Sequence, residues 1–189
     1  MPTEDRRTRE RAARRQLIIT TARRLSESEG WDAVTTRRLS AEIEYSQPVL
    51  YAHFANMEQL AQAVAIDGFR ELAEVLHTAR SGAATAIDAL GQLAHAYLGF
   101  AGDNRALYDA MFTRPTALHF AAEDTPPELK AAFNELRDVV ADLDEVHDAD
   151  TFTEVLWSAL HGLVSLSRNG RLRPSHAAER VELLIAALS

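Results

Sequence analysis

Residues 35–60 read TTRRLSAEIEYSQPVLYAHFANMEQL, and they are the most informative part of the chain. They predict two short helices joined by a tight turn. The first begins after Thr35, which is a good N-cap, and the second spans residues 47–53. Ser46 can cap the second helix, and Pro48 is tolerated in its first turn. Two short, closely joined helices are typical of a helix-turn-helix, in which the second helix enters the major groove of DNA.

Helical spacing of apolar residues continues on both sides of this stretch, and no segment alternates as a strand would. Upstream, a helix is expected over residues 8–29, with Gly30 as its end. Downstream, four helices are predicted to begin after the N-caps Asn56, Thr85, Asn104 and Ser175. Another is predicted to begin at Pro126-Pro127, and one is expected over residues 151–168. The chain is therefore predicted to be all-α, with about nine helices and an N-terminal three-helix unit.

The charge is distributed unevenly along the 189 residues. The net charge is -8, but residues 1–56 sum to +2 and residues 57–189 to -10. The first fifteen residues hold six arginines against three acids. A basic head on an acidic body indicates a protein that touches a polyanion at one end only. A solvated, frayed terminus is the alternative explanation of the basic start.

The predicted groove-entering helix, QPVLYAH, contains no carboxylate. Gln47 can contact an adenine edge, and Val49 or Ala52 can contact a thymine methyl group. Phosphate contacts, which fix position rather than sequence, are expected from Tyr51 and His53 and from the helix start at Thr35. The full set of predicted DNA-binding residues is Arg14, Thr35, Thr36, Arg37, Ser46, Gln47, Pro48, Val49, Tyr51, Ala52 and His53.

Residues 18–60 resemble the tetracycline-repressor-like (TetR) family without gaps. The residues that carry the resemblance are Gly30-Trp31, Thr35, Leu39 with Ser40-Ala41, Ser46, the run Leu50-Tyr51-Ala52-His53-Phe54, Glu58 and Leu60. The chain departs from the family pattern at Glu44 and Tyr45, which replace a glycine and a small aliphatic residue in the turn. It also departs at Ser26, where an aromatic residue usually packs, and at Met57, where the family often has a phosphate-binding lysine.

The resemblance implies a division into residues 1–56, an N-terminal arm with the DNA-binding domain, and residues 57–189, a helical domain that binds an effector and forms the homodimer. It implies a regulator of transcription, in the first instance a repressor that is released from a palindromic operator by its ligand. Residues 157–162 (WSALHG) are similar to the Trp-x-x-x-His-Gly motif of one C-terminal subclass.

Two apolar helices near the C-terminus are the predicted dimer contacts. The helix over 151–168 is apolar on two faces, and the last helix has a clean apolar stripe, so two copies would make a four-helix bundle. The predicted interface residues are Leu156, Leu163, Leu166, Val181, Leu184 and Leu188. The alternative to a dimer is that these two helices cover the core of a monomer.

A pocket for a small apolar or aromatic effector is expected among the middle helices, because aromatic residues gather there with few polar groups. The predicted ligand-binding residues are Tyr97, Phe100, Tyr108, Met111, Phe112, Phe133, Trp157 and His161. Ordinary core packing is the competing interpretation of each.

Catalysis is not expected from this sequence. The seven histidines are scattered, there is no cysteine, and no glycine-rich phosphate loop or nucleophile motif is present, so no metal or cofactor is predicted. No apolar run reaches the length of a membrane span or forms a signal peptide, so a cytoplasmic protein is expected. The second alternative to a ligand-released repressor is a DNA-binding organiser of the same fold without an effector.

Overall fold

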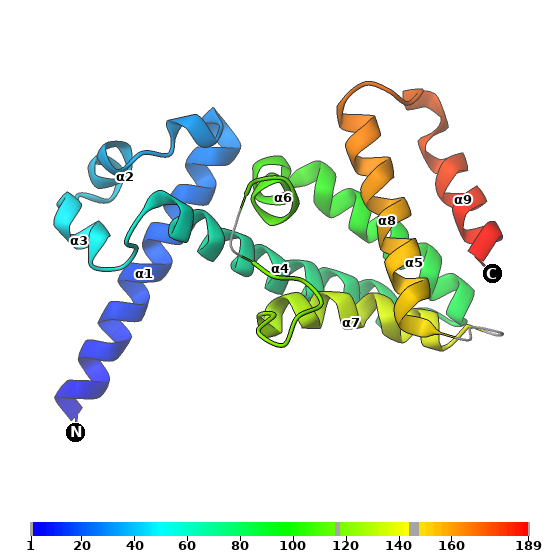
Figure 1. The fold of residues 1–189 in the computed structure, drawn as a ribbon, viewed down its shortest axis with the longest axis horizontal. Coiled ribbons are helices and arrows are strands. Elements are labelled where there is room, and N and C mark those ends of the chain that lie inside the picture. Colours follow the sequence, from blue (N-terminus) through cyan, green and yellow to red (C-terminus); the bar gives the residue numbers. More distant parts are fainter. Residues whose placement is uncertain (1, 116–117, 144–147, 189) are drawn as a thin grey trace. The chain divides into compact units, whose positions relative to one another are not determined.

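The computed structural model describes residues 2–115, 118–143 and 148–188. Within these residues the chain forms nine α-helices, two short 3-10 helices and no strand, which confirms the predicted all-α class (Figure 1). None of the described helices is both long and apolar enough to cross a bilayer. The helices group into two compact units, which are described separately below.

The first unit comprises the residues up to Gly68 together with Asn104–His119. Its helices are α1 (Pro2–Glu29), η1 (Trp31–Ala33), α2 (Thr36–Ile43), α3 (Gln47–Tyr51), the first half of α4 (Met57–Ser81) and α6 (Arg105–Phe112). Helix α1 packs against α2, η1 and α6, and α2 packs against α3. The predicted helix-turn-helix is present, although α3 ends two residues earlier than expected.

Helix α1 begins six residues before its predicted start and runs without a break to Glu29. The helix is buried only in its second half, where Ile18, Ile19, Ala22 and Leu25 enter the core. The side chains from residue 4 to residue 17 are all exposed. The arginine-rich start is therefore a helical extension of α1, and residues 2–7, which were predicted to precede the helix, form its first turns.

Short-range geometry in the turn between α2 and α3 agrees with the sequence at two positions. Thr35 caps α2, because its hydroxyl accepts a hydrogen bond of 3.1 Å from the backbone N–H of Arg38. Glu44, in the place of the usual glycine, has φ 56° and ψ 33°, which is the left-handed conformation. Ser46 stands at the N-cap of α3, but its hydroxyl makes no capping hydrogen bond, so that prediction is wrong.

Helix α6 is joined to α1 by polar contacts that the sequence did not predict. The carboxylate of Glu27 accepts hydrogen bonds from the backbone N–H groups of Ala106 (3.0 Å) and Leu107 (2.9 Å), and so caps α6. The predicted cap, Asn104, makes no side-chain capping bond. Its Oδ1 instead accepts a 2.7 Å hydrogen bond from Arg23. The Trp31 indole N–H also donates to the carbonyl of Ala106, which completes the attachment.

Gly68 permits the close crossing of α4 and α6. A Cβ atom at this position would lie 2.7 Å from Leu107 Cδ1 and 2.8 Å from Met111 Sδ. Real Cβ contacts are essentially never that short, so a larger residue would require the Leu107 and Met111 side chains to move.

The second unit comprises Phe69–Asp103 and the residues from Phe120 onward. Its helices are the second half of α4, α5 (Ala86–Asp103), α7 (Pro127–Ala141), α8 (Ala149–Arg168), η2 (Pro174–His176) and α9 (Ala177–Leu188). Helix α5 is central, because α7, α8 and α9 all pack against it. Apolar α5 residues fill this core, and Leu90, Leu93 and Ala94 are fully buried.

Capping in the second unit follows the sequence in part. Thr85 caps α5 by accepting a 3.1 Å hydrogen bond from the N–H of Asp88, as predicted. Pro127 opens α7, also as predicted. Helix α8 starts two residues early, because Asp148 caps it through the N–H groups of Asp150 and Thr151. Ser175 does not cap α9. It lies within η2, where its hydroxyl meets His176 Nδ1 at 2.7 Å.

Candidate nucleic-acid interface and cavity

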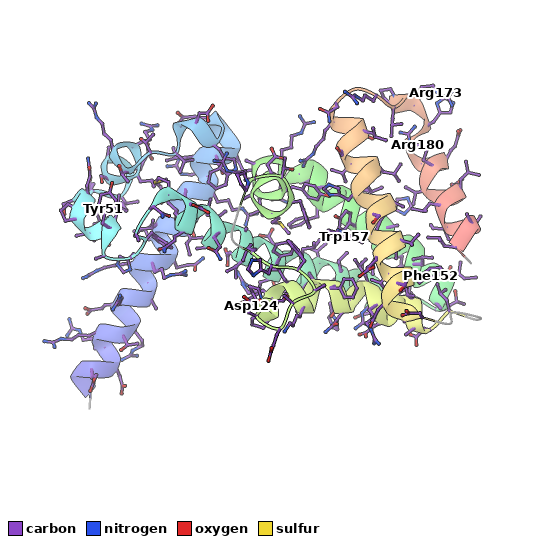
Figure 2. All side chains as sticks on the ribbon, viewed as in Figure 1. Tyr51, Asp124, Phe152, Trp157, Arg173 and Arg180 are labelled. Carbon is purple, nitrogen blue, oxygen red and sulfur yellow. The ribbon has the colours of Figure 1, made fainter. Side chains whose placement is uncertain are left out.

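The exposed surface of α3 and its C-cap carries five of the eleven predicted DNA-binding residues. Gln47, Pro48 and Ala52 are exposed, and Val49 is half-buried. The Tyr51 side chain is 52% exposed, which is unusual for a large aromatic residue, and Figure 2 marks it on this helix. Because Leu50 is the buried member of α3, the helix rests on its unit through one residue and leaves the others free for contact.

A groove lies between α3 and the helical extension of α1. It is lined by Arg11, Arg14, Pro48, Val49, Ala52 and His53. Five of these residues belong to the predicted α3 segment or were predicted as contacts, and Arg11 is the one that was not. Arg11 is one turn from Arg14 on the same helix, so helical spacing could have identified it. The groove thus places two guanidinium groups beside the exposed residues of α3.

The arginines of the first unit divide into paired and unpaired groups. Arg38 binds Glu29 at 3.0 Å and Glu42 at 3.1 Å, and Arg24 also binds Glu42. The unpaired arginines are a different set. Within the described residues, no partner is found for Arg7, Arg11, Arg14, Arg37 or Arg105. All but Arg105 lie on the α1 extension or at the start of α2, where they are available to an anionic backbone.

His53 is affected by this concentration of positive charge. Partial burial, followed by the charges of Arg11, Arg14 and Arg15, lowers the pKa of His53 below its ordinary value of 6.5. The imidazole is therefore neutral at neutral pH and able to donate or accept a single hydrogen bond. The remaining predicted contacts, Thr36 and Arg37, lie in the first turn of α2, whose N-terminus favours anions.

A cavity of about 440 Å³ lies within the second unit. It is lined by Phe120, Ala121, Ala122, Thr125, Leu129, Lys130, Phe133, Asn134, Arg137, Asp150, Glu154 and Trp157. These residues come from the segment before α7, from α7 and from α8. Two of the predicted ligand-binding residues, Phe133 and Trp157, are among them.

The other predicted ligand-binding residues lie away from the cavity lining. Tyr97 and Phe100 are buried in the second unit, and the Tyr97 hydroxyl accepts a 3.1 Å hydrogen bond from the Trp157 indole N–H. His161 is half-buried beside Trp157, with the ring centroids 6.3 Å apart. The remaining three, Tyr108, Met111 and Phe112, belong to α6 in the first unit, where Tyr108 and Met111 are buried in the core.

Sequence reasoning missed the polar side of the cavity. Lys130, Asn134 and Arg137 follow one another at helical spacing on α7, and Asp150, Glu154 and Trp157 do so on α8. Each set forms one helix face. The packing of α7 against α8 depends on contacts between residues distant in sequence. Helical spacing therefore identifies each polar face, but it does not predict that the two faces line one cavity.

The predicted dimer residues differ in exposure. Leu156 and Val181 are buried within the single chain, so they serve the core of the second unit. Leu163, Leu184 and Leu188 are half-buried, and Leu166 is 41% exposed. Two residues outside the predicted set are still more exposed. Val155 on α8 is 53% exposed, and Leu183 on α9 is 70% exposed.

Comparisons with known proteins agree with this arrangement. Residues 18–64 match the family of bacterial regulatory proteins called the tetR family, and residues 90–188 match a tetracyclin repressor-like C-terminal domain. No curated protein sequence matches the chain.

Among solved structures, the chain is similar to a protein of unknown function from Rhodococcus sp. RHA1, with 24% identity, TM-score 0.77 and 92% of each chain covered. It is similar to a bacterial regulatory protein in the tetR family from Rhodococcus RHA1, with 20% identity, TM-score 0.63, and 93% of this chain and 96% of the other covered. It is also similar to the transcriptional regulator FadR from Bacillus subtilis in complex with stearoyl-CoA, with 14% identity, TM-score 0.67, and 90% and 97% covered. At these identities the likeness shows the fold.

Proposed function

The chain belongs to the TetR family of bacterial DNA-binding transcriptional regulators, and we propose that it acts there as a ligand-released repressor that grips a palindromic operator as a homodimer. In functional terms, residues 1–56 bind the operator, and residues 57–189 bind the effector and form the dimer. A regulatory role in the cytoplasm follows from the same proposal, and no catalytic step is needed.

The observation that carries the proposal is the surface formed by α3 and the α1 extension. Helix α3 is free of carboxylates and exposes Gln47, Tyr51 and Ala52. Arg11 and Arg14 line the adjoining groove without partners among the described residues. Side chains that can contact base edges, flanked by unpaired guanidinium groups, suit duplex DNA. Phosphate contacts supply affinity, and base contacts supply specificity.

Helices α8 and α9 are proposed to make the dimer. Of the large apolar side chains that the single chain leaves exposed, Val155 and Leu166 lie on α8 and Leu183 lies on α9. A second copy would cover them around a two-fold axis. The two α3 helices would then be presented about 34–36 Å apart, one turn of DNA, which is the spacing of half-sites in a palindrome.

The effector is proposed to occupy the cavity between α7 and α8. Ligand can weaken DNA binding only if it binds better to a conformation whose α3 spacing does not fit the operator. We also propose that the C-terminal domain is of the Trp-x-x-x-His-Gly subclass, since Trp157 lines this cavity and His161 lies one turn away beside it. Burial, and then the charge of Arg168, lowers the pKa of His161, so its ring is neutral there.

Selection of bound sequences from a random duplex pool tests the DNA-binding proposal. We expect the full-length protein to enrich an inverted repeat, and Gln47→Ala to relax the preference at one position of each half-site. The matched variant, Arg14→Ala, should weaken all sequences alike and reduce the slope of log affinity against log salt by about 1.8, because each subunit of the dimer loses one phosphate contact. Enrichment of no sequence, or an unchanged preference in Gln47→Ala, would contradict the assignment of α3.

Release by ligand is tested separately. A panel of hydrophobic compounds is screened by thermal shift, and DNA retention is measured in parallel with the compounds that stabilise the protein. A compound that raises the melting temperature and releases DNA supports the repressor mechanism. A regulator that organises DNA without an effector would bind its operator equally with and without every compound.

A further inference from the structure

The cavity of the second unit has an apolar side and a polar side, and the combination restricts its ligand. This inference rests on the proposed function, because it names the class of effector that the cavity takes. The apolar side is formed chiefly by Phe120, Leu129, Phe133 and Trp157. The polar side is formed by Lys130, Asn134, Arg137, Asp150 and Glu154.

The rings of Phe120 and Trp157 pack together at the cavity. Phe120 is stacked on Trp157, with ring centroids 6.1 Å apart and an angle of 24° between the planes. It also meets Phe69 edge-on at 5.8 Å, which fixes its orientation. The only hydrogen-bond donor of the Trp157 ring is directed to the Tyr97 hydroxyl. What remains for a ligand is the electron-rich face of these rings, which attracts cations.

The cationic side chains of the polar side already have partners. Arg137 is bound to Asp150. The Lys130 ammonium donates a 3.2 Å hydrogen bond to the backbone carbonyl of Glu123. The Thr125 hydroxyl is also engaged, since it accepts from the N–H of Ala122 at 2.9 Å. Both cations keep further N–H donors, but the charge of Arg137 is already offset by Asp150, so an anionic ligand gains less from it than from a free guanidinium group.

Glu154 differs from these residues. Its carboxylate has no hydrogen-bond or ionic partner in the described part of the chain, and it lies on α8 one turn before Trp157. A side-chain amide, that of Asn134, is likewise unpartnered there and lies across the cavity on α7. Glu154 is therefore a lining carboxylate without a partner among the described residues, on the same face of α8 as Trp157.

The surroundings add to the negative potential. Residues 118–143 and 148–154, which form the cavity and its margins, hold nine acidic and two basic residues. Both of those basic residues are the lining side chains Lys130 and Arg137. Arg80 of α4 pairs with two of the acids, Glu135 and Asp138, so the excess negative charge comes from the others. An excess of one sign of charge around a cleft raises the local concentration of the opposite ion.

We propose that this cavity binds an amphiphilic organic cation, a molecule with an aromatic or branched apolar body and one ammonium group. The body lies against Phe120, Phe133 and Trp157, and the ammonium group is placed between the Trp157 ring and the Glu154 carboxylate. Leu129 closes the apolar side, and Asn134 supplies a neutral polar contact. The ligand is recognised by both its charge and its shape. A neutral molecule of the same shape makes the apolar contacts but lacks the interaction with the Glu154 carboxylate.

Binding of matched probes to the full-length protein tests this inference by calorimetry, without DNA. The cation is (2-naphthylmethyl)trimethylammonium, its neutral isostere carries a tert-butyl group in place of the trimethylammonium group, and the anion is 2-naphthylacetate. We expect the cation to bind about fivefold or more tightly than the isostere, and the anion most weakly. Equal binding of cation and isostere, preference for the anion, or binding of none of the probes would overturn the proposal.

Variants locate the effect. Glu154→Gln keeps the shape of the side chain and should lower the affinity for the cation about fivefold, with the isostere unchanged. Glu154→Lys should transfer the preference to 2-naphthylacetate. Glu123→Gln is the matched control, because it removes an exposed acid outside the lining and should change the affinity less than twofold. An equal loss in Glu123→Gln and Glu154→Gln would show that no specific contact is made.

The outcome is separable from that of the proposed function. Probe binding is measured directly on the protein, and release of operator DNA is measured in a second assay. If the cation binds and DNA is retained, the ligand class stands and the release mechanism falls. If DNA is bound and released by another compound while the cation does not bind, the ligand class falls and the repressor mechanism stands.

Discussion

At residue 44 a glutamate holds a backbone conformation that glycine adopts without cost. Its φ of 56° brings Cβ close to the following carbonyl oxygen, which costs roughly 1–2 kcal/mol for a residue other than glycine. Glu44→Gly removes this cost, but part of the resulting stabilisation is lost because glycine is more flexible in the unfolded chain. We expect Glu44→Gly to raise the free energy of unfolding by about 0.5–1 kcal/mol, measured by urea denaturation.

Glu44→Ala is the control for this substitution. Alanine removes the carboxylate but keeps Cβ, so the left-handed conformation stays strained and no comparable gain is expected. A stabilisation of equal size in both variants would attribute the effect to the charge of Glu44 and not to its backbone. DNA affinity in Glu44→Gly should remain at least that of the parent, because the turn keeps its conformation.

We expect His53 to make operator affinity depend on pH. Its pKa is lowered by burial and by the nearby arginines, so the free protein keeps the ring neutral to a lower pH than an ordinary histidine does. A DNA phosphate in the groove would offset the arginine charges and raise this pKa, so binding takes up a proton. We expect affinity to increase as pH falls from 8 to 6, measured by fluorescence anisotropy at constant salt.

Folding stability should respond in the opposite direction. Because the folded pKa of His53 lies below the unfolded value, the unfolded chain binds more protons as pH falls through 6.5, and stability decreases. His53→Gln should remove the affinity increase while DNA is still bound. The assignment fails if the variant keeps the full pH dependence.

Some features of individual residues could be predicted from the sequence, and others could not. Glu44 was identifiable because a motif position normally held by glycine restricts the backbone whatever residue occupies it. Thr35 and Thr85 were identifiable as caps because a cap bonds to its own helix within three residues. Asn104 was not, because Arg23 is distant in sequence and takes the Oδ1 atom that would otherwise have capped α6.

Among the elements, α6 is the one whose attachment depends most on a distant side chain. Two backbone N–H groups at its start donate to the Glu27 carboxylate from α1. Removing the carboxylate leaves both donors without this partner at the positive end of the helix. Glu27→Ala should lower the free energy of unfolding by about 1 kcal/mol and speed amide exchange in the first turn of α6.

Glu29→Ala is the matched control on the same helix. Its carboxylate binds Arg38 in an exposed ion pair, which contributes little, so a loss below about 0.5 kcal/mol is expected. Similar losses in Glu27→Ala and Glu29→Ala, or exchange that is unchanged at Ala106 and Leu107, would show that the cap is not significant. Both amide positions are resolvable by hydrogen-exchange mass spectrometry or NMR.

The helices themselves were predictable, but their ends and their grouping were only partly so. Periodic apolar residues identified α1, yet its start at Pro2 lies in a segment without a buried face, where the pattern carries no signal. The predicted boundary after residue 56 followed the motif. The compact units instead divide within α4 at Gly68, and α6 joins the N-terminal unit. Contacts such as Glu27 with α6 determine that grouping, and they leave no local trace in the sequence.

For the whole molecule, the proposed dimer requires a partner surface that the single chain leaves uncovered. Large apolar side chains are exposed on α8 and α9, and Leu183 is the most exposed of them at 70%. A carboxylate placed there would be buried against apolar groups of the second copy, which is costly without a partner charge. Leu183→Glu should therefore dissociate the dimer, as measured by analytical ultracentrifugation.

Operator binding should fall with the dimer. One α3 helix contacts only half of a palindrome, and the second half-site is bound at high effective concentration only when the subunits are joined. Ile87→Glu is the control, because Ile87 is 50% exposed on α5 of the same unit and lies outside the proposed interface. It should leave both the mass and the affinity unchanged. If the Leu183→Glu protein stays dimeric, or if the Ile87→Glu protein becomes monomeric, the dimer interface does not lie on the exposed apolar side chains of α8 and α9.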